Sequence, residues 1–243
     1  MIPPKEEKMA ADQTQKAHKD PRISINKLGE YSATNKPARR LRILQDSKFP
    51  PTYQVIRYDP TREIIQKFLS GSIANTQFLQ QEIDKYSKIK TSTDFEDRMK
   101  KSNIEALGFF LQIAPTLDFD GATLAIGHHA PKRLEINDVS ISVRPDLMLS
   151  ASKKGADGRG GIKLNISKGS VHTVDSADYV GTVLRHYLTG QHGADACDYR
   201  LCYTLDVFGK KLSASPKAVT NRMKDIEAAC AEIARQWDSI EPA

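Results

Sequence analysis

The residues best suited to chemistry lie between Leu134 and Lys168, where one acid and several lysines follow apolar runs. Asp146 comes directly after Pro145 and opens a short apolar run. A second run, Ile162 to Lys168, alternates apolar residues with polar ones. A carboxylate is a hard oxygen ligand for Mg²⁺, and a lysine beside the metal can orient a water and stabilise developing negative charge. These residue types together suit metal-dependent hydrolysis of a phosphodiester.

The second of these runs has the period of a half-buried strand. Alternate side chains of a strand point to opposite faces. One face is therefore apolar, and the other is polar and carries a lysine (Lys163, Asn165 and Ser167). None of these three residues is an acid. Lys168 is a second candidate lysine, at the end of the run, so the predicted catalytic residues are Asp146, Lys163 and Lys168.

The Pro145-Asp146 dipeptide, the lysine-bearing strand and the order of the expected elements resemble the PD-(D/E)XK nuclease superfamily. The resemblance covers about Leu117 to Trp237. It implies that Asp146 binds Mg²⁺ as the cofactor, and that the next strand carries an acid followed two residues later by a lysine. Here Lys163-x-Asn165 supplies a lysine and a weak oxygen ligand in reversed order. The (D/E)XK half of the motif is therefore degenerate.

A metal site of this kind needs ligands besides Asp146. We expect Asn165 and Glu135 to complete it, since Glu135 lies on the strand expected before Asp146. The sequence leaves other sources of a second carboxylate open, and these are Asp138, Glu105 and Asp178.

The elements that must position these residues follow from hydrophobic periodicity and from turn and capping signals. The expected strands are Leu134–Val143, Leu147–Ser150, Ile162–Lys168, Arg200–Val207 and a short one through Ala214, with a Gly- and Lys-rich turn over Ser152–Gly161. The expected helices are Lys36–Lys48, Asp59–Leu69, Ile73–Ile89, a helix from the Thr93 capping box to Ile113, Ser176–Thr189 and Pro216–Trp237. The predicted class is α/β (α+β), with a central mixed β-sheet flanked by helices in β-β-β-α-β-β-α order after an N-terminal helical region.

Composition suggests three parts: a disordered tail (1–22), the N-terminal helical region (23–115) and the α/β core (116–243). The first 22 residues are rich in charged residues and have no apolar segment typical of a secretory signal. No run approaches the roughly 18 apolar residues of a membrane span. We therefore expect a cytoplasmic protein that has no membrane partner.

The net charge of +6 favours a polyanionic partner, and DNA is the expected nucleic acid. Arg39, Arg40 and Arg42 form a basic cluster on one predicted helix. They are candidates for phosphate contacts, although a solvated helix face or pairing with acids such as Asp46 would explain them equally well. A second candidate group lies in the Gly- and Lys-rich turn, which could equally be a flexible hairpin tip, and consists of Lys153, Lys154 and Arg159.

Other chemistries have little support in the sequence. The three cysteines lack paired CxxC spacing, so neither a disulfide framework nor a zinc site with His192 is expected. The adjacent His128 and His129 would point apart on an extended segment. There is no P-loop, GxGxxG, GxSxG or HExxH motif.

Two functions remain open. The first is a DNA-acting protein with a nuclease-like core, capable of metal-dependent phosphodiester hydrolysis within a phage-defence or repair assembly. That setting is implied only by where such folds recur. The alternative is a catalytically inactive subunit with a nuclease fold that binds nucleic acid or a protein partner as an assembly module.

Overall fold

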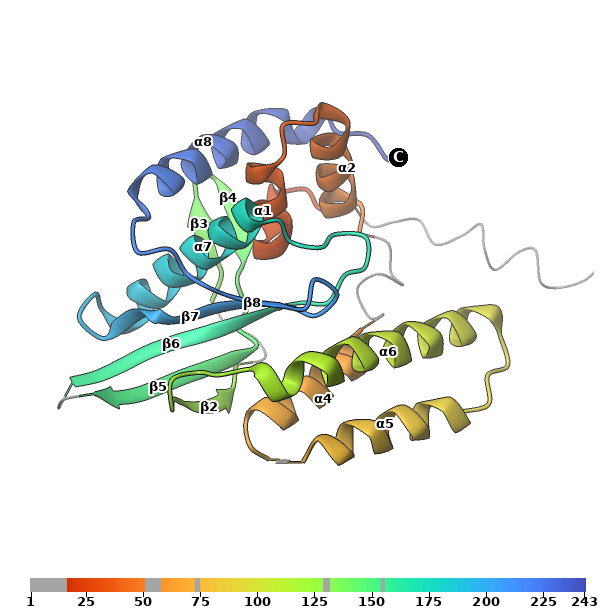
Figure 1. Ribbon diagram of the computed structural model, residues 1–243. Helices are drawn as coiled ribbons and strands as arrows, with labels where there is room; N and C mark the ends of the chain where they lie inside the picture. The colour runs from red at the N-terminus through yellow and green to blue at the C-terminus, as the bar shows by residue number, and fades with distance from the viewer. Residues whose placement is uncertain (1–16, 51–57, 73–74, 129–131, 154–155) are drawn as a thin grey trace, which may run out of the picture.

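The computed structural model describes residues 17–50, 58–72, 75–128, 132–153 and 156–243 (Figure 1). The chain is a mixed α/β protein with two β-sheets flanked by helices. The helices within the described ranges are α1 (Ile25–Ala33), α2 (Pro37–Lys48), α4 (Asp59–Leu69), α5 (Thr76–Lys88), α6 (Asp94–Ile113), α7 (Val174–His192) and α8 (Thr220–Gln236). Two short 3-10 helices follow α6 and α8, at Ala114–Thr116 and Trp237–Ser239.

The larger sheet has five strands in the order β2-β5-β6-β7-β8. Its strands are β2 (Thr123–Ile126), β5 (Leu147–Lys153), β6 (Ala156–Asn165), β7 (Cys197–Asp206) and β8 (Lys211–Ala214). The β6–β7 pair is parallel and the other pairs are antiparallel. A parallel connection needs a crossover, and α7 supplies it. The sheet is therefore mixed, as predicted.

The smaller sheet corrects the first predicted strand. Leu134–Val143 is not one strand of the central sheet but a hairpin, β3 (Leu134–Ile136) and β4 (Val139–Ser142). Asn137 and Asp138 form its turn with φ of 45° and 61°. Two successive left-handed residues are typical of a two-residue hairpin turn, and Asn and Asp tolerate this conformation. β4 also pairs in parallel with β1 (Arg22–Ser24), which gives the order β1-β4-β3.

The predicted turn over Ser152–Gly161 is also wrong. β5 continues to Lys153 and β6 begins at Ala156, so most of that segment is a paired hairpin, with residues 154–155 outside the described part. The glycines allow close packing: a Cβ at position 160 would lie 2.1 Å from the Leu201 carbonyl oxygen on β7. β6 ends at Asn165, so Lys168 lies beyond the strand that was expected to carry it.

Most of the helix predictions agree with the structure, because capping chemistry defines helix ends locally. The helix over Asp59–Leu69 is confirmed, and the Thr93 side chain caps α6 by accepting from the Glu96 N–H. The Glu96 carboxylate also accepts from the Ser92 N–H at 2.7 Å. The last helix begins at Thr220, not at Pro216.

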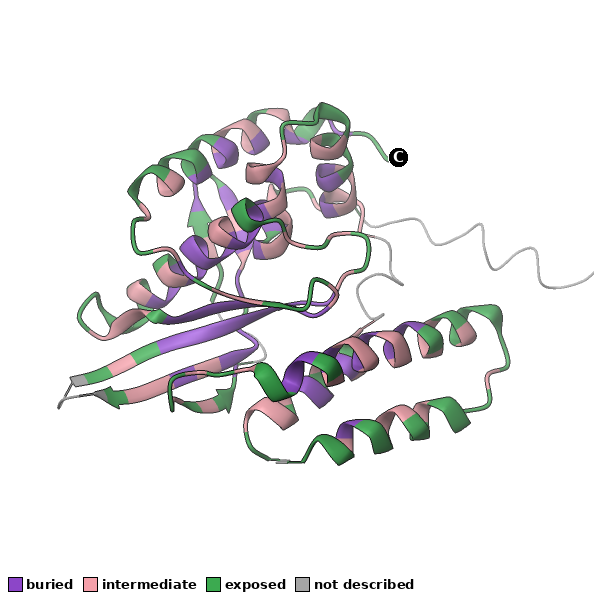
Figure 2. Cartoon of the chain, in the orientation of Figure 1, coloured by how far each residue is buried: buried purple, intermediate pink, exposed green. Residues whose placement is uncertain are grey.

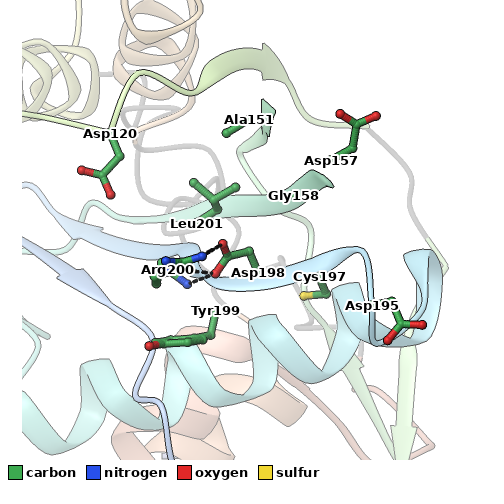
Figure 3. A pocket seen from close by; sticks show the side chains of 10 residues that line it. All are labelled: Asp120, Ala151, Asp157, Gly158, Asp195, Cys197, Asp198, Tyr199, Arg200 and Leu201. Carbon is green, nitrogen blue, oxygen red and sulfur yellow. Dashed lines mark hydrogen bonds and ion pairs between the residues drawn. The ribbon is translucent and has the colours of Figure 1, made fainter. Parts of the chain in front are cut away.

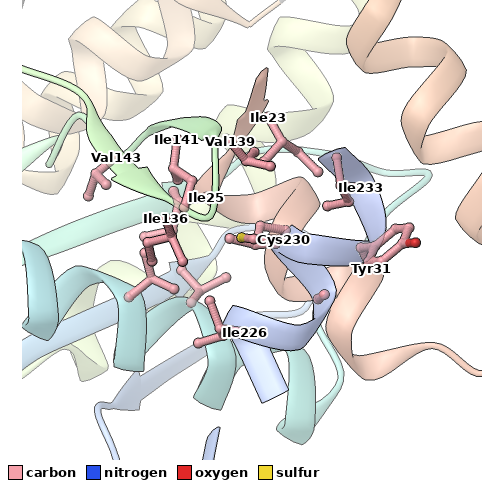
Figure 4. Packing of buried hydrophobic residues seen from close by; sticks show 14 of the residues in the cluster. Ile23, Ile25, Tyr31, Ile136, Val139, Ile141, Val143, Ile226, Cys230 and Ile233 are labelled. Atoms are coloured by element: carbon pink, nitrogen blue, oxygen red, sulfur yellow. The ribbon is translucent and has the colours of Figure 1, made fainter. Parts of the chain in front are cut away.

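Two apolar clusters lie on opposite faces of the larger sheet (Figure 2). The α7-side core lies between that sheet, α1, α7, α8 and the smaller sheet (Figure 4). The α6-side core packs α4, α5 and α6 against the other face and takes up Ile162, Leu164 and Ile166, the apolar face predicted for that strand. Both cores contain residues from either side of position 116, so the expected helical region and the expected core pack together.

The start of the described chain is also part of this packing. His18 donates its N–H to the Lys48 carbonyl at 2.9 Å and accepts from the Trp237 indole at 3.1 Å. The described end of the predicted tail, residues 17–22, is therefore held by the fold, and residues 1–16 lie outside the described part. In the described ranges, no helix is both long and apolar enough to cross a bilayer.

Candidate functional site

Asp146 lies directly before β5, where three segments meet. Its N–H donates to the Ile162 carbonyl on β6 at 2.8 Å. Its carbonyl accepts from the Gly127 N–H at 3.0 Å and from the Gln66 side chain of α4 at 2.9 Å. Asp146 is only 4% exposed. Its backbone therefore ties α4 and the segment after β2 to the centre of the sheet.

The Asp146 carboxylate is surrounded by donors from the protein itself. Oδ1 forms an ion pair with the Arg62 guanidinium of α4. Oδ2 accepts from the Leu164 N–H at 2.8 Å and lies 3.1 Å from Lys163 Nζ. Lys163 also donates to the Arg144 carbonyl at 2.8 Å. Both carboxylate oxygens thus have strong, charge-assisted partners.

These contacts determine the charge states of the buried pair. Burial alone would raise the pKa of Asp146, but the nearby Lys163 and Arg62 cations and the Leu164 N–H outweigh it and lower the pKa. Burial lowers the pKa of Lys163, and the Asp146 carboxylate opposes that shift. The arrangement is an ionised aspartate neutralised by two protein cations.

A cavity of about 370 Å³ opens beside this cluster. Asp59 and Glu63 of α4 line it together with Asp146, Lys163 and Arg144. A second cavity, of about 530 Å³, lies next to it. Ser24 and Arg62 line both, so the two hollows adjoin at these residues.

Arg144 has an unusual backbone conformation at the edge of the first cavity. Its φ is 40°, in the left-handed region that non-glycine residues rarely adopt. The Arg144 carbonyl accepts a hydrogen bond from Lys163, while the residue as a whole is exposed. Strain of this kind persists only where the surrounding contacts impose it, and it is often found at functional positions.

Of the predicted catalytic residues, the structure brings Asp146 and Lys163 together but not Lys168. Lys168 is exposed and pairs with Glu105 of α6 at 2.6 Å. Of the two lysines that the sequence offered, Lys163 is therefore the one that pairs with Asp146. The strand expected to carry Lys168 ends too early, so the Lys168 side chain leaves the sheet on the α6 side.

The predicted metal ligands do not assemble. Asn165 is buried but donates to Asp206 at 3.0 Å and to the Ser170 carbonyl at 2.7 Å, so its amide serves a different cluster. Glu135 is exposed on β3 of the smaller sheet. Neither residue forms a hydrogen bond or an ion pair with the Asp146 carboxylate, whose partners are Arg62, Lys163 and the Leu164 N–H.

The other carboxylates considered as metal ligands also have different surroundings. Glu105 pairs with Lys168, Asp178 pairs with Arg222 of α8, and Asp138 lies in the exposed β3–β4 turn. On the Lys163 face of β6, the position two residues earlier is Gly161, where the superfamily's order would place the acid. Within the described ranges, no group of three or more His, Cys, Asp or Glu side chains is arranged to hold a metal ion. The residues present do not fit the Mg²⁺ site that the resemblance implies.

The arginines of the basic cluster on α2 are engaged in intramolecular contacts. Arg39 pairs with Glu30, and Arg42 pairs with Asp46, the partner considered from the sequence. Arg40 contacts Glu232 at 3.3 Å and lies over a tyrosine ring. Exposed pairs of this kind are weak, so the arginines remain able to exchange these partners for phosphates.

The second basic group lies at the β5–β6 hairpin. Arg159 is exposed on β6. Lys154 lies outside the described residues, and so does the side chain of Lys153.

Sequence reasoning missed Arg62, Gln66 and Gly127, which complete the surroundings of Asp146. Arg62 and Gln66 are four residues apart on α4 and so share one helix face. That spacing was available in the sequence, but nothing local shows which strand the face meets. Gly127 is needed because a Cβ there would lie 2.0 Å from the Pro145 carbonyl oxygen.

Comparison with known proteins does not assign the chain to a family. No protein-family model matches the chain, and no curated protein matches its sequence.

Proposed function

We propose that this protein is a non-cleaving nucleic-acid-binding subunit built on a nuclease-like core, and that Asp146 is a structural anchor in it. One observation carries the proposal. Both carboxylate oxygens of Asp146 are engaged by donors of the protein, at the position where the superfamily would hold a metal. A protein cation in place of a divalent ion leaves no Lewis acid to lower the pKa of a water or to stabilise a leaving oxygen.

The sheet order supports the nuclease-like part of the proposal. β2, β5 and β6 form an antiparallel unit, α7 follows, and β7 lies parallel to β6. We take these elements as the β-β-β-α-β part of the expected order, with β8 and α8 completing it. The Pro145-Asp146 dipeptide then lies at the start of the second strand of the unit, beside Lys163 on the third.

One exposed arginine and the charge of the whole chain support the binding part. Five cationic side chains and five carboxylates line the two adjoining cavities; the cations are Lys27 and Arg39 in the larger, Arg144 and Lys163 in the smaller, and Arg62 in both. Arg144 is exposed there, and the chain as a whole has a net charge of +6. Contacts from such cations to backbone phosphates release counterions and give affinity that falls with salt. DNA is the proposed ligand.

Metal-dependent cleavage is the second candidate, and one observation favours it. Asp59, Glu63 and Asp146 line one cavity together with Lys163. For these carboxylates to act together, the Arg62 guanidinium would have to leave Asp146. In either case we propose a multi-protein setting such as phage defence or repair, which is suggested only by where such folds recur.

The test combines cleavage and binding on the same preparation. Wild-type protein and Asp146→Asn are incubated with supercoiled and linear DNA in Mg²⁺ or Mn²⁺, and binding is followed by fluorescence anisotropy over a salt series. We expect intact DNA with both proteins and wild-type binding that weakens as salt rises. Cleavage by wild type that Asp146→Asn abolishes would establish the second candidate, and the absence of salt-sensitive binding would refute the first.

A further inference from the structure

An irregularity in β7 brings two cysteines together. In the β6–β7 ladder Cys197 lies opposite Arg159, and Cys202 lies opposite Gly161. An advance of two residues along β6 therefore corresponds to an advance of five along β7, and residues 198–201 form a bulge. In a regular strand, residues five apart would be separated by about 16 Å and point to opposite faces.

The bulge places both cysteines on one face at disulfide spacing. Their partners on β6 are two residues apart, which corresponds to about 6.6 Å along a strand, within the Cα separation that disulfides span. Both side chains point towards α7, where Cys197 Sγ lies 3.8 Å from the Arg185 carbonyl and Cys202 belongs to the α7-side core. Cys202 Sγ donates to the Asp198 carbonyl at 3.5 Å, within the same bulge.

The two thiols differ in exposure in the way that a reactive pair requires. Cys202 is fully buried, whereas Cys197 is partly exposed and lines a cavity of about 290 Å³ with Asp195 and Asp198 (Figure 3). The third cysteine, Cys230, is buried on α8 (Figure 4). Burial raises its pKa to about 12, which keeps it as an unreactive thiol.

Electrostatics favour Cys197 as the nucleophile. The neighbouring Cys202 thiol lowers the pKa of Cys197, and the Thr189 side chain and the Arg185 cation act in the same direction, so that together they outweigh the effect of burial. The thiolate is the reactive form of cysteine, and a second thiol at disulfide spacing is positioned to resolve an oxidised sulfur.

We propose that Cys197 and Cys202 are a peroxide-sensitive thiol pair that closes to an intramolecular disulfide. The Cys197 thiolate attacks one oxygen of hydrogen peroxide; an S–O bond forms, the O–O bond breaks, and hydroxide leaves. The Cys202 thiol then attacks the sulfenic sulfur; an S–S bond forms, the S–O bond breaks, and the departing hydroxide takes the thiol proton as water. The two thiols lose two electrons and the peroxide gains them, giving two waters in all. An external dithiol reverses the change by thiol–disulfide exchange.

The inference is independent of nucleic-acid binding, because the thiol pair and the Asp146 cluster share no residues. Oxidation would fasten the bulge into a closed loop beside β6. Leu201, inside that loop, already lies against β6 at Gly160.

The test uses the whole folded protein and peptide mapping. Trypsin cuts after Arg185, Arg200 and Lys210, so Cys197 and Cys202 fall in two different peptides that a disulfide would join. After mild peroxide treatment we expect the intact mass to fall by about 2 Da and the joined peptide pair to appear, both reversed by dithiothreitol. Cys230 should remain free to alkylation after unfolding.

Three variants separate this chemistry from general oxidation. Cys230→Ser is the matched control and should behave as wild type. Cys197→Ser should form no disulfide and no sulfenic acid, and Cys202→Ser should stop at a sulfenic acid on Cys197 that dimedone traps. Wild-type circular dichroism before and after peroxide shows that the protein stays folded. Failure of the folded wild type to form the joined peptides, or their formation only between two chains, would overturn the proposal.

Discussion

The Arg62 guanidinium and the Asp146 carboxylate form an ion pair across 84 residues of sequence. It joins α4 to the start of β5, and Lys163 approaches the other oxygen of the same carboxylate at 3.1 Å. Asp146 and Lys163 are both buried, whereas the Arg62 side chain is 29% exposed. The carboxylate is therefore the shared partner of one buried cation and one half-buried cation, and several consequences can be measured.

Asp146→Asn should lower the free energy of unfolding by about 3 kcal/mol, because it leaves the buried Lys163 ammonium without its counter-charge. Urea denaturation followed by circular dichroism measures the change. Lys168→Gln is the matched control, since it removes an exposed pair with Glu105 and should cost less than about 1 kcal/mol. Equal effects of the two substitutions would contradict the anchoring role of Asp146.

Stability should fall in acid through Asp146. Burial opposes ionisation, but Lys163 and Arg62 lower the pKa of Asp146 below its unfolded value of about 3.9. Between these two pKa values the unfolded chain binds more protons than the folded one, so stability increases with pH there. The contribution is complete above about pH 5 and is lost as the pH falls through the folded value. Urea midpoints measured from pH 6 to pH 2 should decline more steeply for wild type than for Asp146→Asn, and parallel curves would argue against the shift.

Gly127→Ala should destabilise the protein by about 2 kcal/mol or more, because the added Cβ would lie 2.0 Å from the Pro145 carbonyl oxygen. The clash falls beside the backbone contacts of Asp146. Gly108→Ala on α6 is the control: nothing lies within 4 Å of its Cβ, and alanine favours a helix by up to about 1 kcal/mol. The midpoint temperature of thermal unfolding should therefore fall for Gly127→Ala and rise for Gly108→Ala.

Arg144→Gln should weaken DNA binding and reduce the slope of log affinity against log salt by about 0.9, the value for one lost phosphate contact. The side chain is exposed at the cavity beside Asp146, and Gln keeps most of its length. Arg235→Gln, on the last turn of α8, is the control and should leave the slope unchanged. An unchanged slope for Arg144→Gln would place the DNA elsewhere on the surface.

The sequence was sufficient for features with local causes. Asp59 and Pro60 define the start of α4, Thr93 caps α6, and the alternation through Ile162 and Leu164 identifies a strand with one buried face. Asn137-Asp138 was missed as a turn because the flanking residues on both sides are apolar and read as one continuous strand. The only local signal for a turn was the tendency of Asn and Asp to adopt a left-handed backbone conformation.

The site was only partly predictable. Asp146 and Lys163 are neighbours because β5 and β6 are adjacent strands, which the order of elements implied. Arg62 could not be assigned, because its contact depends on how α4 packs against the sheet. For the same reason the sequence alone could not separate a metal ligand from an ion-paired anchor at Asp146.

Urea unfolding of the wild-type protein with and without millimolar Mn²⁺ distinguishes a structural anchor from a metal ligand at Asp146, because any ion that binds the folded state stabilises it. The anchoring role of Asp146 predicts an unchanged midpoint with Mn²⁺. A midpoint that rises with Mn²⁺ in wild type, but not in Asp146→Asn, would show that Asp146 is a metal ligand and not an ion-paired anchor.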